Sequence, residues 1–150
     1  MKKKYILIVM AAIIALAVLW IGTAGFETVS FPGRADVSVV YDYTIYETGN
    51  DGKKVERRIA FEEKLTTEEA NRVIEILEGK AYDFYFGSTP SCGFDRDIAL
   101  IVNGVRFSMA CDKCGTLLNW RNMRYVEISA EEREVLEEMF TSRGGKFPCI

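Results

Sequence analysis

The sequence predicts an α+β fold, with one antiparallel sheet of about five strands and two amphipathic helices on one face. A signal or transmembrane segment is expected to precede this domain. Three observations lead to this prediction. The first 26 residues consist of a short basic segment and an apolar run. Runs of alternating apolar and polar residues flank two turns. Two later segments begin with helix-capping signals.

The N-terminus fits two kinds of targeting segment. Lys2, Lys3 and Lys4 precede a stretch from Tyr5 to Phe26 that carries no charge. A cleaved signal peptide would be cut after Ala24, whereas an uncleaved anchor needs about 20 apolar residues to cross the hydrocarbon. In both cases the lysines stay in the cytoplasm and the rest of the chain is exported. The membrane-spanning side chains would include Ile6, Leu7, Ile13, Ile14, Leu16, Leu19 and Trp20.

The chain therefore divides into a signal peptide or signal anchor (1–26), a short tether with Pro32-Gly33 (27–34) and a single exported domain (35–150). We expect the product to lie in the cell membrane as a single-pass protein with its domain outside, or to be secreted after cleavage near Ala24.

Composition argues against two classes of function. The 22 acidic residues outnumber the 19 basic ones, and three of the basic residues lie before the apolar run. A mildly acidic domain is a poor nucleic-acid binder, because such binding needs clustered positive charge. The chain has no histidine, which excludes histidine-dependent catalysis and histidine-ligated metal sites. No P-loop, nucleophile elbow or dinucleotide motif occurs, so an enzyme is not indicated.

The first half of the domain predicts a hairpin and a helix. Asp36 to Glu47 alternates apolar and polar residues, a turn follows at 48–52, and a second alternating run ends at Glu62. Thr66 and Glu69 form a capping box, which starts a helix that Gly79 ends. Its apolar stripe is Ala70, Val73, Ile74 and Leu77.

The second hairpin is centred on Asn103-Gly104, because a type I′ turn needs positive φ at both central residues. A two-residue loop fixes the register, and the expected apolar pairs are Val102 with Val105, Leu100 with Phe107, and Ile98 with Met109. The other face would hold Ala99, Ile101, Arg106 and Ser108.

The last part of the domain predicts a strand and a helix. Residues 116–120 could form a single helical turn but give no strong signal. Met123 to Ile128 is the expected strand, and Ser129 with Glu132 caps the helix that follows. Its apolar stripe is Val135, Leu136, Met139 and Phe140, and the tail to Ile150 has no element to hold it.

The four cysteines are Cys92, Cys111, Cys114 and Cys149. In an exported chain they indicate two structural disulfides. A Cys111–Cys114 bond is disfavoured because its loop is short. The pairings Cys92–Cys114 with Cys111–Cys149, and Cys92–Cys111 with Cys114–Cys149, stay open.

Two alternatives use the same cysteines. The segment Cys111-Asp112-Lys113-Cys114-Gly115 has the shape of one zinc knuckle, so the four cysteines form a weak zinc site without a second knuckle. Cys111 and Cys114 could instead form a redox dithiol, although no clear helix follows them. The favoured interpretation has no cofactor, with zinc as the weak alternative.

Three other groups could bind something. The aromatic run Tyr82 to Phe86 is either a ligand platform or a cover for the core. Lys113, Arg121 and Arg124 are an anion patch or scattered charge, and Asp95-Arg96-Asp97 is typical of a solvated hairpin end. The sequence as a whole indicates a non-enzymatic binding or envelope-associated module, with an unidentified protein or small molecule as partner. A thiol-disulfide protein or a zinc-stabilised domain is the alternative.

Overall fold

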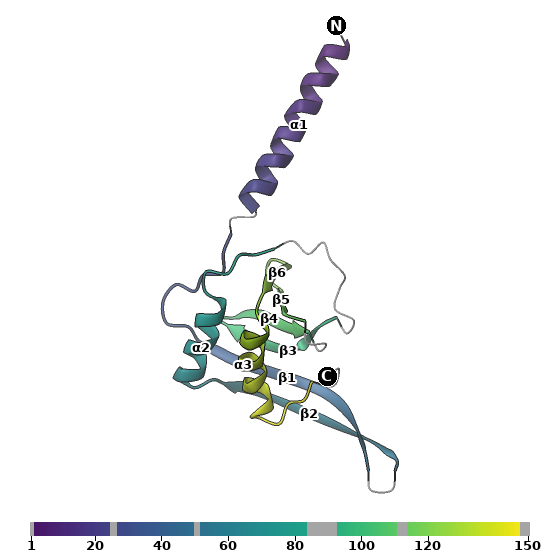
Figure 1. Ribbon diagram of the computed structural model, residues 1–150, viewed down its shortest axis with the longest axis vertical. Coiled ribbons are helices and arrows are strands. Elements are labelled where there is room, and N and C mark those ends of the chain that lie inside the picture. The colour runs from purple at the N-terminus through teal and green to yellow at the C-terminus, as the bar shows by residue number, and fades with distance from the viewer. Residues whose placement is uncertain (1, 25–26, 50–51, 84–92, 111–113, 148–150) are drawn as a thin grey trace.

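The computed structural model describes residues 2–24, 27–49, 52–83, 93–110 and 114–147. It confirms an α+β fold (Figure 1). The helices are α1 (Lys2–Ala24), α2 (Thr67–Leu77) and α3 (Ala130–Thr141). The strands are β1 (Val37–Thr48), β2 (Lys54–Lys64), β3 (Phe94–Val102), β4 (Val105–Ala110), β5 (Thr116–Asn119) and β6 (Arg124–Glu127).

The six strands form one open antiparallel sheet in the order β2-β1-β3-β4-β5-β6. This is one strand more than the sequence predicts, because 116–119 is not a helical turn but the strand β5. Its four residues are buried and pair with β4 on one side and β6 on the other. Pairing on both sides overrides the weak local signal of so short a segment.

Helices α2 and α3 lie together on one face of the sheet, where both contact β1 (Figure 1). The core lies between them and the strands. Tyr41 of β1 is at its centre. Its ring stacks on that of Phe61, with centroids 5.3 Å apart, and lies tilted against that of Phe140, with centroids 6.4 Å apart. Burial of such large apolar side chains is the main stabilising contribution of this layer.

Both predicted capping boxes are present. The hydroxyl of Thr66 accepts a hydrogen bond from Glu69 N, and that of Ser129 accepts one from Glu132 N. The apolar stripes differ slightly from those expected. Ile76 is buried on α2 while Ile74 is half-buried, and on α3 Arg133 is buried while Val135 is half-buried.

The second hairpin has the predicted turn, with φ of +49° at Asn103 and +76° at Gly104. Val102 pairs with Val105 and Leu100 with Phe107, as expected. The expected pairing of Ile98 with Met109 lies in the stretch between Phe94 and Ala99, where the register of β3 against β4 shifts.

The face of β3 and β4 away from the helices is less open than the sequence suggests. Ala99 and Ser108 are fully buried there, on the face opposite the apolar pairs, where the alternation placed them. The indole of Trp120 donates a hydrogen bond of 2.7 Å to Ser108 Oγ, and the guanidinium of Arg96 lies 5.0 Å from the Trp120 ring. Trp120, Ser108 and Arg96 therefore form a second, smaller cluster on this face.

The outer half of β1 and β2 extends beyond the rest of the sheet as a two-stranded ribbon, because β1 pairs with β3 only from Val37 to Tyr41 (Figure 1). At the opposite end of the molecule α1 projects away from the domain. Its large apolar side chains, among them Ile6, Leu7, Ile13, Ile14, Leu16 and Leu19, are exposed. Within the residues that the structure describes, none of the helices is long and apolar enough to cross a membrane.

The segment that follows α1 packs onto the domain. Val29 is 1% exposed, its N–H donates to Lys80 O at 2.8 Å, and its carbonyl accepts from Gly79 N at 2.9 Å. Tyr82 N donates to Glu27 O at 3.0 Å, and the carboxylate of Glu27 pairs with Arg124. The predicted tether thus begins as part of the folded structure.

Candidate functional site

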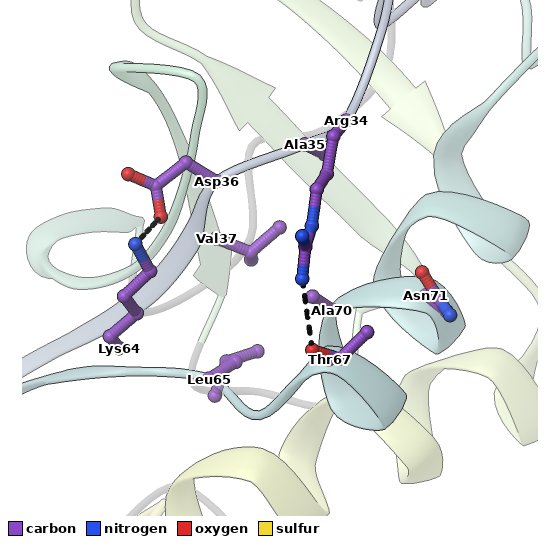
Figure 2. Close-up of a pocket in the computed structure, with 9 residues that line it drawn as sticks. All are labelled: Arg34, Ala35, Asp36, Val37, Lys64, Leu65, Thr67, Ala70 and Asn71. Carbon is purple, nitrogen blue, oxygen red and sulfur yellow. Dashed lines mark hydrogen bonds and ion pairs between the residues drawn. The ribbon is translucent and has the colours of Figure 1, made fainter.

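Two hollows are lined in part by the segment 30–37. The first, about 450 Å³, is enclosed by the start of β1, the end of β2 and the start of α2 (Figure 2). Its floor includes Val37, Leu65 and Ala70. Arg34 reaches across it to within 3.4 Å of Thr67 Oγ1, and Lys64 pairs with Asp36 at 2.8 Å. Both cations at this hollow therefore already have partners within the chain.

The second hollow is a cleft of about 480 Å³. It lies between the segment 30–32, Tyr82, the β3–β4 turn and the β5–β6 turn. Its lining residues are Ser30, Phe31, Pro32, Tyr82, Val102, Asn103, Val105, Phe107, Asn119, Arg121 and Asn122. The combination of apolar and aromatic walls with a few polar groups is typical of ligand sites.

The apolar side of this cleft is firmly packed. The rings of Phe31 and Phe107 meet edge to face, with centroids 6.1 Å apart, and Phe107 is fully buried. Val105, which is half-buried, continues the same side of the cleft, and the fully buried Val102 pairs with it across the β3–β4 hairpin. These residues come from the N-terminal segment and from adjacent strands, so the folded sheet forms the cleft.

The polar side is organised around Asn119, which is 3% exposed. Its Nδ2 donates to Tyr82 Oη at 2.7 Å, and its Oδ1 accepts from Arg121 N at 2.8 Å. Arg124 stacks on Tyr82, with its guanidinium carbon 5.5 Å from the ring centroid. The hydrogen bonds and the stacking hold Tyr82 in one orientation.

Burial raises the pKa of Tyr82, whereas the hydrogen bond from Asn119 and the charge of Arg124 act in the opposite direction. Because the net change is upward, the phenol stays protonated at neutral pH. Tyr82 therefore presents a hydroxyl group and not a phenolate to this cleft.

The cleft unites two groups that the sequence singled out separately. Tyr82 comes from the predicted aromatic platform and Arg121 from the predicted anion patch, whereas Arg124 of that patch stacks on Tyr82 without lining the cleft. Arg124 is not surface charge, because its side chain is 7% exposed and pairs with Glu27. The rest of the platform after Asp83, and Lys113, lie outside the described residues.

Residues Asp95 to Asp97 belong to β3 and contribute no site of their own. Asp95 Oδ1 accepts a hydrogen bond of 2.9 Å from Asp97 N, a local turn contact, and Arg96 stacks on Trp120. This agrees with the interpretation of a solvated hairpin end.

Of the four cysteines only Cys114 is described; Cys92, Cys111 and Cys149 lie outside the described residues. Cys114 is half-buried just before β5, with Sγ 3.3 Å from Thr116 Oγ1. The next residue, Gly115, packs so closely that an added Cβ would lie 2.5 Å from Ile128 O. The glycine after the Cys-x-x-Cys pair thus has a packing role. Among the described residues there is no group of three or more metal-binding side chains.

Described residues at or near three of the four cysteines contact Arg133, whose side chain is 4% exposed. Its guanidinium donates to the carbonyl oxygens of Ala110 and Cys114, and lies 5.9 Å from the ring of Phe147. Ala110 in turn pairs with Phe94. Sequence patterns missed Arg133, because its position on α3 gives no sign that an arginine would be buried.

The tail before Cys149 is also held, contrary to expectation. Tyr41 Oη accepts a hydrogen bond of 3.0 Å from Lys146 N, and the ring of Phe147 meets that of Phe140 at 5.7 Å. The tail therefore has anchors of its own within the described residues.

Comparison with known proteins found no matching family model, no matching curated protein and no matching solved structure.

Proposed function

We propose that this protein is a non-enzymatic binding module, held at the outer face of a membrane by its N-terminal segment. Its ligand site is the second hollow, the cleft that Tyr82, Asn119 and Arg121 line. The observation that carries the binding role is the meeting of Tyr82, Asn119 and Arg121 at a cleft with an aromatic side. Such a site suits a small ligand, or the end of a peptide, that has an apolar body and an anionic group.

The N-terminal segment supports the membrane location. Tyr5 to Phe26 carries no charge, Lys2 to Lys4 flank it, and its described large apolar side chains are exposed. Apolar side chains all round a helix are stable only in an apolar surrounding. Secretion after cleavage near Ala24 is the alternative outcome.

Two disulfides are part of the same proposal. The carbonyls of Ala110 and Cys114 and the ring of Phe147 all contact Arg133, and Phe94 pairs with Ala110. Apart from Arg133, each of these residues lies within two positions of a cysteine or is one. Their convergence supports pairing among the cysteines and leaves both connectivities open.

The binding role is tested by titrating the full chain in detergent micelles with 2-naphthoate, an aromatic carboxylate. The readout is the side-chain amide NMR signals of Asn103, Asn119 and Asn122. We expect saturable shifts of these signals, and a loss of about tenfold or more in affinity on Arg121→Ala, because a charge-assisted contact contributes about 1.5–3 kcal/mol. Arg57→Ala on the distant ribbon is the matched control.

Non-saturable shifts, or equal affinity for the Arg121 and Arg57 variants, would contradict a ligand site in this cleft. The membrane location is tested on its own by adding protease to spheroplasts, which should remove the domain. Resistance to the protease would contradict the outside location.

A further inference from the structure

The end of α1 and the start of the domain are close together. Only two residues separate Ala24 from Glu27. Three Cα–Cα steps span at most about 11 Å. If α1 is a membrane helix, Glu27 therefore lies at the membrane surface.

Glu27 is fixed to one edge of the domain. Its carboxylate pairs with Arg124 at the start of β6, and its carbonyl accepts from Tyr82 N. Two residues later Val29 is buried and bonded to Gly79 and Lys80. The short connection and these contacts bring the start of β6 toward the membrane, and Figure 1 shows β6 at the end of the domain nearest α1.

The β5–β6 turn, residues 120–123, directly precedes Arg124. Asn119 shapes it, since Asn119 O accepts from Met123 N at 2.9 Å and Asn119 Oδ1 accepts from Arg121 N at 2.8 Å. Met123 has φ of +56° and is 58% exposed, and Arg121 is exposed.

The turn thus presents an apolar and a cationic side chain together. Outside α1, Tyr46 and Val55 are the other large apolar residues exposed in the described part of the chain. Both belong to the ribbon at the far end of the domain (Figure 1). Met123 is therefore the exposed apolar residue on the side of α1.

We propose that the β5–β6 turn docks on the headgroups of anionic phospholipids in the membrane that holds the N-terminal segment. When no ligand occupies the cleft, Arg121 meets the lipid phosphates, and Met123 enters the interfacial region. This inference rests on the membrane anchoring proposed above. Cationic side chains at an anionic surface and apolar side chains at the interface both favour such docking.

The test uses the full chain, synthesised in the presence of phosphatidylglycerol vesicles. Extraction with sodium carbonate first establishes that the chain is integral to the membrane. The photo-crosslinking residue p-benzoylphenylalanine then replaces Met123, or Tyr46 as the matched exposed control. Intact mass after irradiation reports attached lipid.

We expect lipid adducts at position 123 and none at position 46. The yield at position 123 should fall about fivefold in phosphatidylcholine vesicles and about fivefold on Arg121→Gln. Arg57→Gln should leave it unchanged.

A carbonate-resistant chain without adducts at 123, or with equal adducts at 123 and 46, would overturn the docking and leave the anchoring intact. Equal yields in the two lipids, or for the Arg121 and Arg57 variants, would overturn the role of the headgroup charge. Extraction of the chain by carbonate would overturn the anchoring, and the docking with it.

Discussion

Arg133 donates a hydrogen bond from Nη1 to the backbone carbonyl of Cys114, across 19 positions of the sequence. The same guanidinium donates to Ala110 O and, through Nε, to Glu137 Oε1 at 2.6 Å. One buried side chain thereby links α3 to the last residue of β4 and to Cys114, the described residues on either side of 111–113.

Arg133→Ala should reduce the free energy of unfolding by about 3–5 kcal/mol, because it leaves a mostly buried carboxylate and two carbonyls without their donor. The matched control is Arg72→Ala, which removes an exposed pair with Glu68 at the same four-residue spacing. That change should cost about 0.3–0.5 kcal/mol. Urea unfolding of the full chain in micelles measures both, and similar losses would show that Arg133 has no special role.

Leu100→Ala should cost about 2–5 kcal/mol, because Leu100 is fully buried opposite Phe107. Val55→Ala on the ribbon, where the side chain is 52% exposed, should cost much less. The same urea titration compares the two. If Val55→Ala lowered the free energy of unfolding as much as Leu100→Ala does, the core would not be centred on Leu100 and Phe107.

The two capping glutamates should make stability depend on acid pH. Burial tends to raise the pKa of Glu69, but bonds from Thr66 and Arg143 hold it below its usual value. The pKa of Glu132 is also lowered against the effect of burial, by Lys80 and the N–H of Ser129.

Folding lowers the pKa of both glutamates, so their ionised forms stabilise the fold. This stabilisation is complete above the pKa of glutamate in the unfolded chain, about 4.3, and is lost as pH falls through the lower pKa values of the folded chain. The melting temperature should therefore drop between pH 5 and pH 3. Glu69→Gln with Glu132→Gln keeps the capping oxygens but removes this titration, so the drop should be smaller. An unchanged pH profile in the double variant would contradict the assignment.

If the domain is exported as proposed, it should contain no free thiol, and its intact mass should be four hydrogens below the reduced value. A bond from Cys149 to Cys111 or Cys114 would close a loop that corresponds to roughly 3–4 kcal/mol in the chain-entropy model. Cys149→Ser should therefore lower the melting temperature. Peptide mapping without reduction distinguishes the two connectivities.

If all four cysteines can be labelled only after a chelator is added, the four cysteines bind zinc and do not form two disulfides. A change of state at Cys111 and Cys114 alone, at mild reducing potentials, would favour thiol exchange.

Features set by local sequence were predicted well. The turn at Asn103-Gly104 and the caps at Thr66 and Ser129 depend on residues within a few positions, so their patterns are complete in the sequence. The register of the second hairpin follows from its turn as far as Ala99, and the shift beyond Ala99 carries no local signal.

Features that depend on distant contacts were missed. Strand β5 exists because β4 and β6 lie on both sides of it. Arg133 is buried because carbonyls from two other elements reach it, and Ser108 is buried because Trp120 covers it. For the same reason the cleft was not foreseen, although Tyr82 and Arg121 were noted separately.

The pairing of residues 27–29 with residues 79–82 also defines a path for mechanical load. A pull on α1 does not first straighten a slack linker, because the chain is bonded to the domain from Glu27 onward. The load passes first to the end of α2 and to β6, while the β1–β2 ribbon lies at the far end of the domain (Figure 1). Under tension, the contacts of Glu27 and Val29 should therefore break before the sheet does.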